Sequence, residues 1–151
     1  MKVRDIMETN VITVSPDTSY HDIARILYEK NISGMPVVDA AGEVLGIVSE
    51  KDIFRVLYPS YQNLYDDMGA ATASYLEGRE KEAQQKENIP ASAFMTKNVI
   101  QLHPDDPIMK AGSLMLAKNI SRFPVVENGR VVGVISRKMI YRAILKKSFG
   151  F

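Results

Sequence analysis

The feature that most constrains this chain is that much of its sequence occurs twice. Residues 5–38 align with residues 93–126 at an offset of 88, and 13 of the 34 positions are identical. Residues 44–55 align with residues 131–142 at an offset of 87, and 6 of the 12 positions are identical. The offset changes where "DAAGEV" faces "ENGRV", which indicates a hairpin loop that differs in length by one residue. The chain is therefore predicted to contain two copies of one small structural motif.

Each copy predicts the order strand, helix, strand, strand, helix. "VITV" (11–14) and "VIQL" (99–102) are short apolar runs followed closely by proline, as is typical of strands that end at a turn. "MPVVD" with "EVLGIVS", and "FPVVE" with "RVVGVIS", predict hairpins whose strands are covered on both faces. Asn128 and Gly129 favour a two-residue type I′ turn, and "AAGE" favours a longer loop. The predicted fold class is α/β, or α+β within each copy.

The first helix of each copy is predicted from its ends and from its apolar spacing. Thr18–Ser19 and Asp106–Pro107 are residue pairs that favour a helix N-terminus. Asn31 and Asn119 stand where these helices must end, since Asn tolerates the left-handed backbone that follows many helices. The apolar residues that share one helical face are Ile23, Ile26 and Leu27 in the first copy and Ala111, Leu114 and Met115 in the second.

Composition narrows the class of protein. With 151 residues, 46% of them hydrophobic, the chain is long enough to form one compact module with a sizeable core. Nineteen basic against eighteen acidic residues leave a net charge of +1, which disfavours nucleic acid as a partner. There is no cysteine, hence no disulfide framework and no sign of secretion. No run reaches the roughly 18 apolar residues of a membrane span, so we expect a cytoplasmic protein without a membrane segment.

One segment lies outside the repeat. Residues 58–90 hold four of the seven tyrosines and are rich in helix formers apart from Gly78, so they predict one or two helices rather than a disordered linker. The predicted organisation is a first repeat at 1–57, a helical insertion at 58–90, and a second repeat with a C-terminal tail at 91–151.

The doubled pattern resembles the CBS domain, which occurs in tandem pairs called Bateman modules. The residues that carry the resemblance are "DIM…NVITVSPDTS…KNISGMPVVD…GEVLGIVSEKDI" and their second copy, over about residues 1–57 and 91–145. The resemblance implies two repeats packed through their sheets around a pseudo-twofold axis, with two clefts that adenosine-containing ligands can occupy. It also implies a module that pairs into homodimers and regulates another protein instead of catalysing a reaction.

Asp52 is the residue on which the two copies differ most informatively. Ser49 and Asp52 have the spacing of a capping box, which needs no ligand. The family pattern Gly-x-x-Ser/Thr-x-x-Asp implies instead that this carboxylate accepts hydrogen bonds from the ribose hydroxyls, and the two interpretations are compatible. The second copy keeps Ser136 but has Met139 in place of the acid, so the acid is dispensable for starting the helix. Because Met139 cannot accept a ribose hydrogen bond, we expect one strong ligand site, around the first copy.

The resemblance assigns further ligand contacts, each of which has a structural alternative. Ile12 and Met35 could be ordinary core residues. Ser49 and Lys51 begin a helix, where free N–H groups favour an anion. Arg122 replaces Gly34 of the first copy and is expected near ligand phosphates, or else on the open surface. The complete predicted nucleotide-binding set is Thr9, Asn10, Ile12, Ser33, Met35, Pro36, Ser49, Lys51, Asp52 and Arg122.

The sequence thus predicts a regulatory module that binds an adenosine nucleotide (AMP, ADP or ATP) or an S-adenosyl-type ligand and signals to an unidentified effector protein, as a homodimer. No metal is expected. Catalysis is not predicted, because His21 and His103 do not align with each other and none of the common catalytic motifs occurs. The alternative is a ligand-free oligomerisation or protein-interaction module in which Asp52 is only a helix cap.

Overall fold

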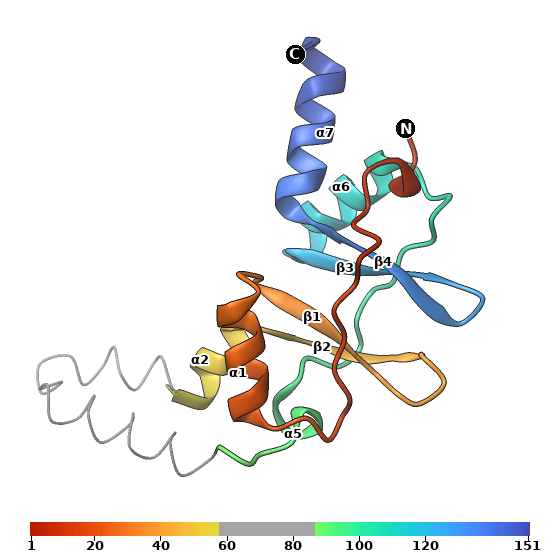
Figure 1. Cartoon of the computed structure of the whole chain (residues 1–151). Helices are drawn as coiled ribbons and strands as arrows, with labels where there is room; N and C mark the ends of the chain where they lie inside the picture. Colours follow the sequence, from red (N-terminus) through yellow and green to blue (C-terminus); the bar gives the residue numbers. More distant parts are fainter. Residues whose placement is uncertain (58–86) are drawn as a thin grey trace, which may run out of the picture. The chain divides into compact units, whose positions relative to one another are not determined.

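The computed structural model of the chain describes residues 1–57 and 87–151 (Figure 1). The helices predicted for the insertion therefore lie outside the described residues, except for its last four positions. The chain divides into two compact units. The first unit contains Met1–Thr13, Val38–Leu45 and Asn98–Phe151, and the second contains Val14–Val37 with the described part of Gly46–Lys97. None of the helices in the described ranges is long and apolar enough to cross a membrane.

The second unit is built on the helices and most of the hairpin of the first repeat. Helix α1 (Tyr20–Glu29) precedes a two-stranded sheet of β1 (Gly34–Val38) and β2 (Val44–Ser49), which helix α2 (Glu50–Leu57) follows directly. A short helix, α5 (Ala91–Phe94), completes the unit, with its Phe94 ring packed edge-on against Tyr20. The buried apolar residues of this unit are Val14, Tyr20, Ile23, Leu27, Met35, Val37, Ile47, Val48 and Ala91.

The first unit repeats this order in the second half of the chain. Helix α6 (Ile108–Lys118) precedes the antiparallel strands β3 (Arg122–Glu127) and β4 (Arg130–Ser136), and helix α7 (Arg137–Phe149) follows. A single 3₁₀ turn, η1 (Val3–Asp5), packs on it from the N-terminus. Its buried core consists of Val3, Leu102, Ile108, Ala111, Met115, Phe123, Val125, Ile135, Ile140 and Ala143. The prediction of a mixed helix and strand fold with two small hairpins is confirmed.

The local signals at helix ends and turns are largely confirmed. Ser19 caps α1, since its Oγ accepts the N–H of Asp22 at 3.1 Å. Asn31 and Asn119 have φ angles of 51° and 52°, so both adopt the left-handed conformation that was predicted. The hairpin turn between β3 and β4 has positive φ at both central residues, Asn128 and Gly129, as a type I′ turn requires.

Two local predictions are wrong. Residues 11–14 and 99–102 do not form regular strands; each makes one parallel bridge, Val14 to Val37 and Leu102 to Val125. The neighbouring residues of β1 and β3 are prolines, which have no N–H to donate, and the runs end at further prolines, so a longer ladder cannot form. Asp106 is not the cap of α6, because its carboxylate accepts from the N–H of His103 (2.8 Å) and from Lys110 (3.0 Å).

The residues just before 11–14 and just before 99–102 each cross a strand, and each crossing lies next to a glycine of that strand. Thr96 and Ile47 exchange both backbone hydrogen bonds, at 2.8 and 3.0 Å, and Glu8 and Val134 do the same at 2.9 Å. A Cβ at Gly46 would lie 2.6 Å from the carbonyl oxygen of Thr96, so the close approach depends on that position having no side chain. This crossing brings Thr96 to the first turn of α2.

Candidate functional site

The candidate site is the carboxylate of Asp52, in the first turn of α2. It is 2% exposed, and no other charged residue in the described ranges is buried. Removing a carboxylate from water is unfavourable unless its oxygens accept hydrogen bonds, so a buried acid at this place must have partners.

Four donors meet this carboxylate from three residues. Oδ2 accepts from the backbone N–H of Ser49 at 2.9 Å and from its hydroxyl at 3.1 Å. Oδ1 accepts from Nη1 of Arg55 at 3.0 Å and from the hydroxyl of Thr96 at 2.9 Å. The bond from the Ser49 N–H is the capping-box contact, so Asp52 does help to start α2. The contacts from Arg55 and Thr96 go beyond what a cap requires.

The second copy starts its helix without an acid. Ser136 caps α7, since its hydroxyl accepts the N–H of Met139 at 3.4 Å. The residue aligned with Thr96 is Glu8, whose carboxylate accepts the N–H of Asn10 at 2.7 Å. The two helix starts thus share their backbone geometry and differ in chemistry. Thr96 from the second copy meets Asp52 at the start of α2, whereas of the aligned residues Met139 stands at the start of α7 and Glu8 in the segment that bridges Val134 before it.

Six of the ten predicted contact residues lie in the second unit: Ser33, Met35, Pro36, Ser49, Lys51 and Asp52 itself. Met35 and Pro36 are buried in β1, as the core alternative expects. The carbonyl of Ser33 accepts the N–H of Glu50 at 3.0 Å, which ties the entry to β1 to the start of α2. That bond uses one of the N–H groups predicted to favour an anion at Ser49 and Lys51, and the Lys51 side chain is exposed.

The other four predicted residues belong to the first unit. Thr9 and Asn10 are exposed, Ile12 is partly buried, and Arg122 is partly buried at the start of β3. Their part in ligand binding stays a prediction. In the described part of the chain no group of three or more His, Asp or Glu residues could hold a metal ion.

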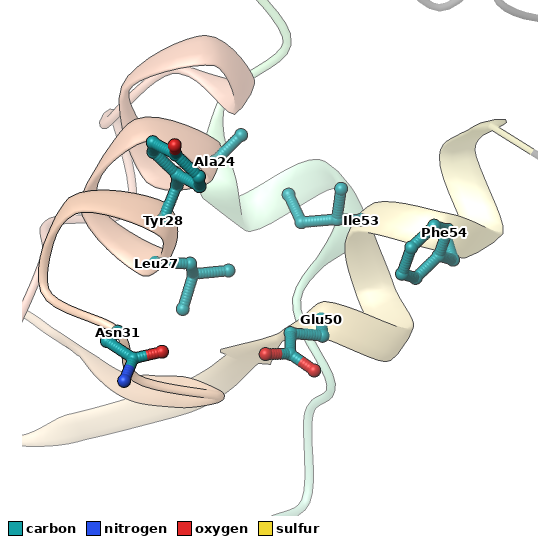
Figure 2. A pocket seen from close by; sticks show the side chains of 7 residues that line it. All are labelled: Ala24, Leu27, Tyr28, Asn31, Glu50, Ile53 and Phe54. Carbon is teal, nitrogen blue, oxygen red and sulfur yellow. The ribbon is translucent and has the colours of Figure 1, made fainter.

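Two surface cavities lie elsewhere on the helices. A cavity of about 480 Å³ opens between α1 and α2, where Figure 2 shows Leu27 and Ile53 facing the same space with Tyr28 and Phe54 at its rim. A second cavity, of about 640 Å³, runs along α7 and is lined by Ile6, Met139, Arg142, Ala143, Leu145, Lys146 and Phe151. Asp52 lines neither cavity, so neither one is the predicted ribose site.

Thr96 and Arg55 are site residues that the sequence interpretation missed. Thr96 is 44 residues from Asp52 in the chain, and no periodic pattern connects them. A signal was present in the repeat itself, because Thr96 against Glu8 and Asp52 against Met139 are both differences between the copies. Arg55 could not have been found in this way, because Arg142 occupies the aligned position.

Known proteins and a family model match this chain over nearly its whole length. The family model of the CBS domain matches twice, at residues 3–59 and 91–146. The chain is 28% identical to protein MJ1426 of Methanocaldococcus jannaschii over 96% of its own length and 92% of that protein. It is 29% identical to the homoserine O-acetyltransferase of Methanohalobium evestigatum, of which it spans only 24%. Among solved structures, the CBS domain pair of protein MJ0100 in complex with 5′-methylthioadenosine and S-adenosyl-L-methionine is 31% identical, with a TM-score of 0.73 over 97% of this chain and 98% of that one.

Proposed function

We propose, because this chain belongs to the CBS-domain family, that it is a regulatory module which binds an adenosyl ligand through Asp52 and reports the bound state to another protein. The observation that carries the proposal is the buried carboxylate of Asp52, which one copy has and the other lacks. Since Ser136 starts α7 without an acid, the need for a helix cap does not account for Asp52.

The chemistry of Asp52 suits a ribose. A vicinal diol presents two hydroxyl donors, and an ionised carboxylate is an acceptor on both oxygens. Hydrogen bonds to a charged partner contribute about 1.5–3 kcal/mol each, so two of them set an upper estimate of roughly 3–6 kcal/mol of binding free energy. An acidic residue does equivalent work for ribose in dinucleotide-binding folds.

The ligand class rests on the relatives. The CBS pair of MJ0100 was solved with 5′-methylthioadenosine and S-adenosyl-L-methionine, and its sequence identity to this chain is 31%. We therefore place these two compounds beside AMP, ADP and ATP in the panel to be tested. The chain spans 24% of the homoserine O-acetyltransferase that it matches, so that enzyme's activity is not proposed for it.

The test is thermal unfolding of the wild type, Asp52→Ala and Met139→Ala against this panel. A ligand at 100 times its dissociation constant stabilises by about 2.7 kcal/mol, which is a shift of several degrees in a protein of this size. We expect one compound to raise the melting temperature of the wild type and of Met139→Ala, and to leave the melting temperature of Asp52→Ala unchanged. Met139→Ala is the matched control, since it truncates the aligned position of the second copy.

Two outcomes would contradict the proposal. If Asp52→Ala responds as the wild type does, the carboxylate is a helix cap and the ligand binds elsewhere. If no adenosyl compound raises the melting temperature of the wild type, the alternative of a ligand-free interaction module is favoured.

Self-association belongs to the same proposal, with a second copy of this chain as the partner. Support comes from the cavity between α1 and α2, at whose rim Tyr28 is 86% exposed (Figure 2). A large aromatic side chain at that exposure, beside an apolar cavity, favours a protein partner over water. We expect Tyr28→Asp to shift the sedimentation coefficient from dimer to monomer. A dimer that persists in this variant would exclude Tyr28 from the interface.

A further inference from the structure

The carboxylate of Asp52 is fully occupied before any ligand arrives. A carboxylate has about four lone-pair positions, and four donors lie within 2.9–3.1 Å of its two oxygens. A ribose brings two more hydroxyl donors. If Asp52 is the ribose acceptor, as proposed above, some of the present donors must leave when the ligand binds.

The two oxygens differ in how easily their donors can leave. Oδ2 is held by the backbone N–H and the hydroxyl of Ser49, and the N–H cannot withdraw without altering the start of α2. Among the described residues, the donors to Oδ1 are all side-chain ends, those of Arg55 and Thr96. The Arg55 side chain is 67% exposed, so its guanidinium can return to water at little cost. The Thr96 hydroxyl needs only a rotation about χ1 to leave.

We propose that Oδ1 of Asp52 is an exchange point, at which ribose hydroxyls replace Arg55 and Thr96. Arg55 is then an internal competitor that weakens ligand binding. Thr96 is a positioning residue. When its hydroxyl is displaced from Asp52, residues 95–97 lose a hydrogen bond that holds them in place. The inference rests on the proposed function and adds to it a path by which ligand binding at Asp52 changes the structure of a neighbouring segment.

The route follows from what holds Thr96. Its backbone exchanges two hydrogen bonds with Ile47, at 2.8 and 3.0 Å, and its hydroxyl is bonded to Asp52. With the hydroxyl displaced, this segment keeps its backbone pair with Ile47 and the packing of Met95 on Gly46, but it loses its side-chain link to α2. Residues 95–97 are the last of the second unit, and the chain continues from them into the first unit at Asn98. A ligand bound at Asp52 therefore loosens the point at which the chain passes from one unit to the other.

The first experiment measures the competition by Arg55. Affinities of the wild type, Arg55→Gln and Arg142→Gln are compared by calorimetry, with adenosine and 5′-methylthioadenosine as probes. Neither probe has a phosphate, so a released Arg55 cannot pair with ligand charge. We expect Arg55→Gln to bind about two- to five-fold more tightly, because an exposed ion pair no longer opposes the ribose.

Arg142→Gln is the matched control for this experiment. It makes the same change at the aligned position of the second copy, where Met139 offers no carboxylate to compete for, and its affinity should equal that of the wild type. An Arg55→Gln protein that binds as the wild type does, or more weakly, would overturn the competition.

The second experiment follows the release of Thr96 by amide hydrogen exchange at Ile47 and at residues 95–97. In the wild type, saturating 5′-methylthioadenosine should speed exchange there by loosening the segment. Thr96→Val keeps the shape of the side chain and removes the hydroxyl. It should bind at least as tightly as the wild type, exchange fast already without ligand, and change no further when ligand is added.

Failure of the inference is distinguishable from failure of the proposed function. If Asp52→Ala abolishes binding while Arg55→Gln and Thr96→Val leave affinity and exchange as in the wild type, Asp52 is the ribose acceptor and the exchange point is wrong. Loss of binding in Thr96→Val would also overturn the inference, since it would make Thr96 a ligand contact instead of a competitor. If neither probe binds the wild type, the exchange point is overturned, since the ribose alone then does not displace Arg55 and Thr96, whereas the proposed function fails only if no compound of the whole panel binds.

Discussion

Asp52 contributes to stability as well as to the candidate site, and the two roles can be separated by measurement. Replacing it with Ala leaves the N–H and hydroxyl of Ser49 and the hydroxyl of Thr96 without their acceptor. We expect Asp52→Ala to lower the free energy of unfolding by about 1–3 kcal/mol in urea titrations at neutral pH. Arg55→Ala should cost less than about 1 kcal/mol, since its side chain is 67% exposed. Equal losses in the two variants would contradict this account of the site.

Residue-level prediction succeeded where the cause is local. Asn31 and Asn119 could be assigned left-handed backbone because the residue type itself determines how well that conformation is tolerated. The Ser49–Asp52 pair could be assigned because a capping box has a fixed spacing. Thr96 could not be assigned to Asp52, since their contact depends on a crossing of distant segments at Gly46 that no local pattern encodes.

At the scale of elements, the two strand crossings give a matched pair of substitutions. A Cβ at Gly46 would lie 2.6 Å from the carbonyl oxygen of Thr96, whereas a Cβ at Gly133 would lie 2.7 Å from Sδ of Met7 and 3.1 Å from a carbonyl oxygen. The Met7 side chain can move aside, but the Thr96 carbonyl is fixed by its bridge to Ile47.

We therefore expect Gly46→Ala to destabilise by more than Gly133→Ala, within the range of about 1–3 kcal/mol for overpacking a well-packed site. Urea titration of both variants checks the order. A Gly133→Ala protein that is the less stable of the two would show that the Met7 side chain is not free to move.

The N-terminal segment is held to the turn before α6 by charge. Oδ1 of Asp105 accepts from Nε and Nη2 of Arg4, at 2.9 and 2.7 Å, and from Lys2 at 3.4 Å. The hydrogen bonds from Arg4, with the attraction of its charge, lower the pKa of Asp105 below its ordinary value. A lowered folded-state pKa stabilises the fold above the unfolded value and ceases to do so as the pH falls through the folded value.

We expect Asp105→Asn to melt below the wild type at pH 7, and the two melting curves to converge as the pH falls below about 4, the ordinary pKa of an aspartate. Added salt at pH 7 should narrow the gap, because these side chains are about half exposed. A gap that is independent of pH would mean that Asp105 acts through packing or turn geometry and not through its charge.

At the scale of the whole molecule, the repeat made the doubled fold predictable, and the differences between its copies indicated the candidate site. An alignment of the chain with itself predicts two hairpins and their helices, because both copies need the same apolar positions. It also isolates Asp52, because a difference between otherwise similar copies is not required by the shared backbone. The alignment could not foresee that residues 11–14 and 99–102 would be reduced to single bridges, since that depends on the prolines of the opposing strands.

The same asymmetry predicts the stoichiometry of the intact protein. The carboxylate that can accept a ribose occurs only in the first copy, while the aligned position of the second copy is Met139. Since a thioether is at best a weak acceptor, we expect calorimetric titration of the wild type with the stabilising adenosyl compound to give one tight site per chain. Met139→Ala should keep one tight site per chain, and Asp52→Ala should have no tight site. Two sites of comparable affinity per chain would show that the ligand is held chiefly by contacts that the copies share, and that Asp52 is not what distinguishes them.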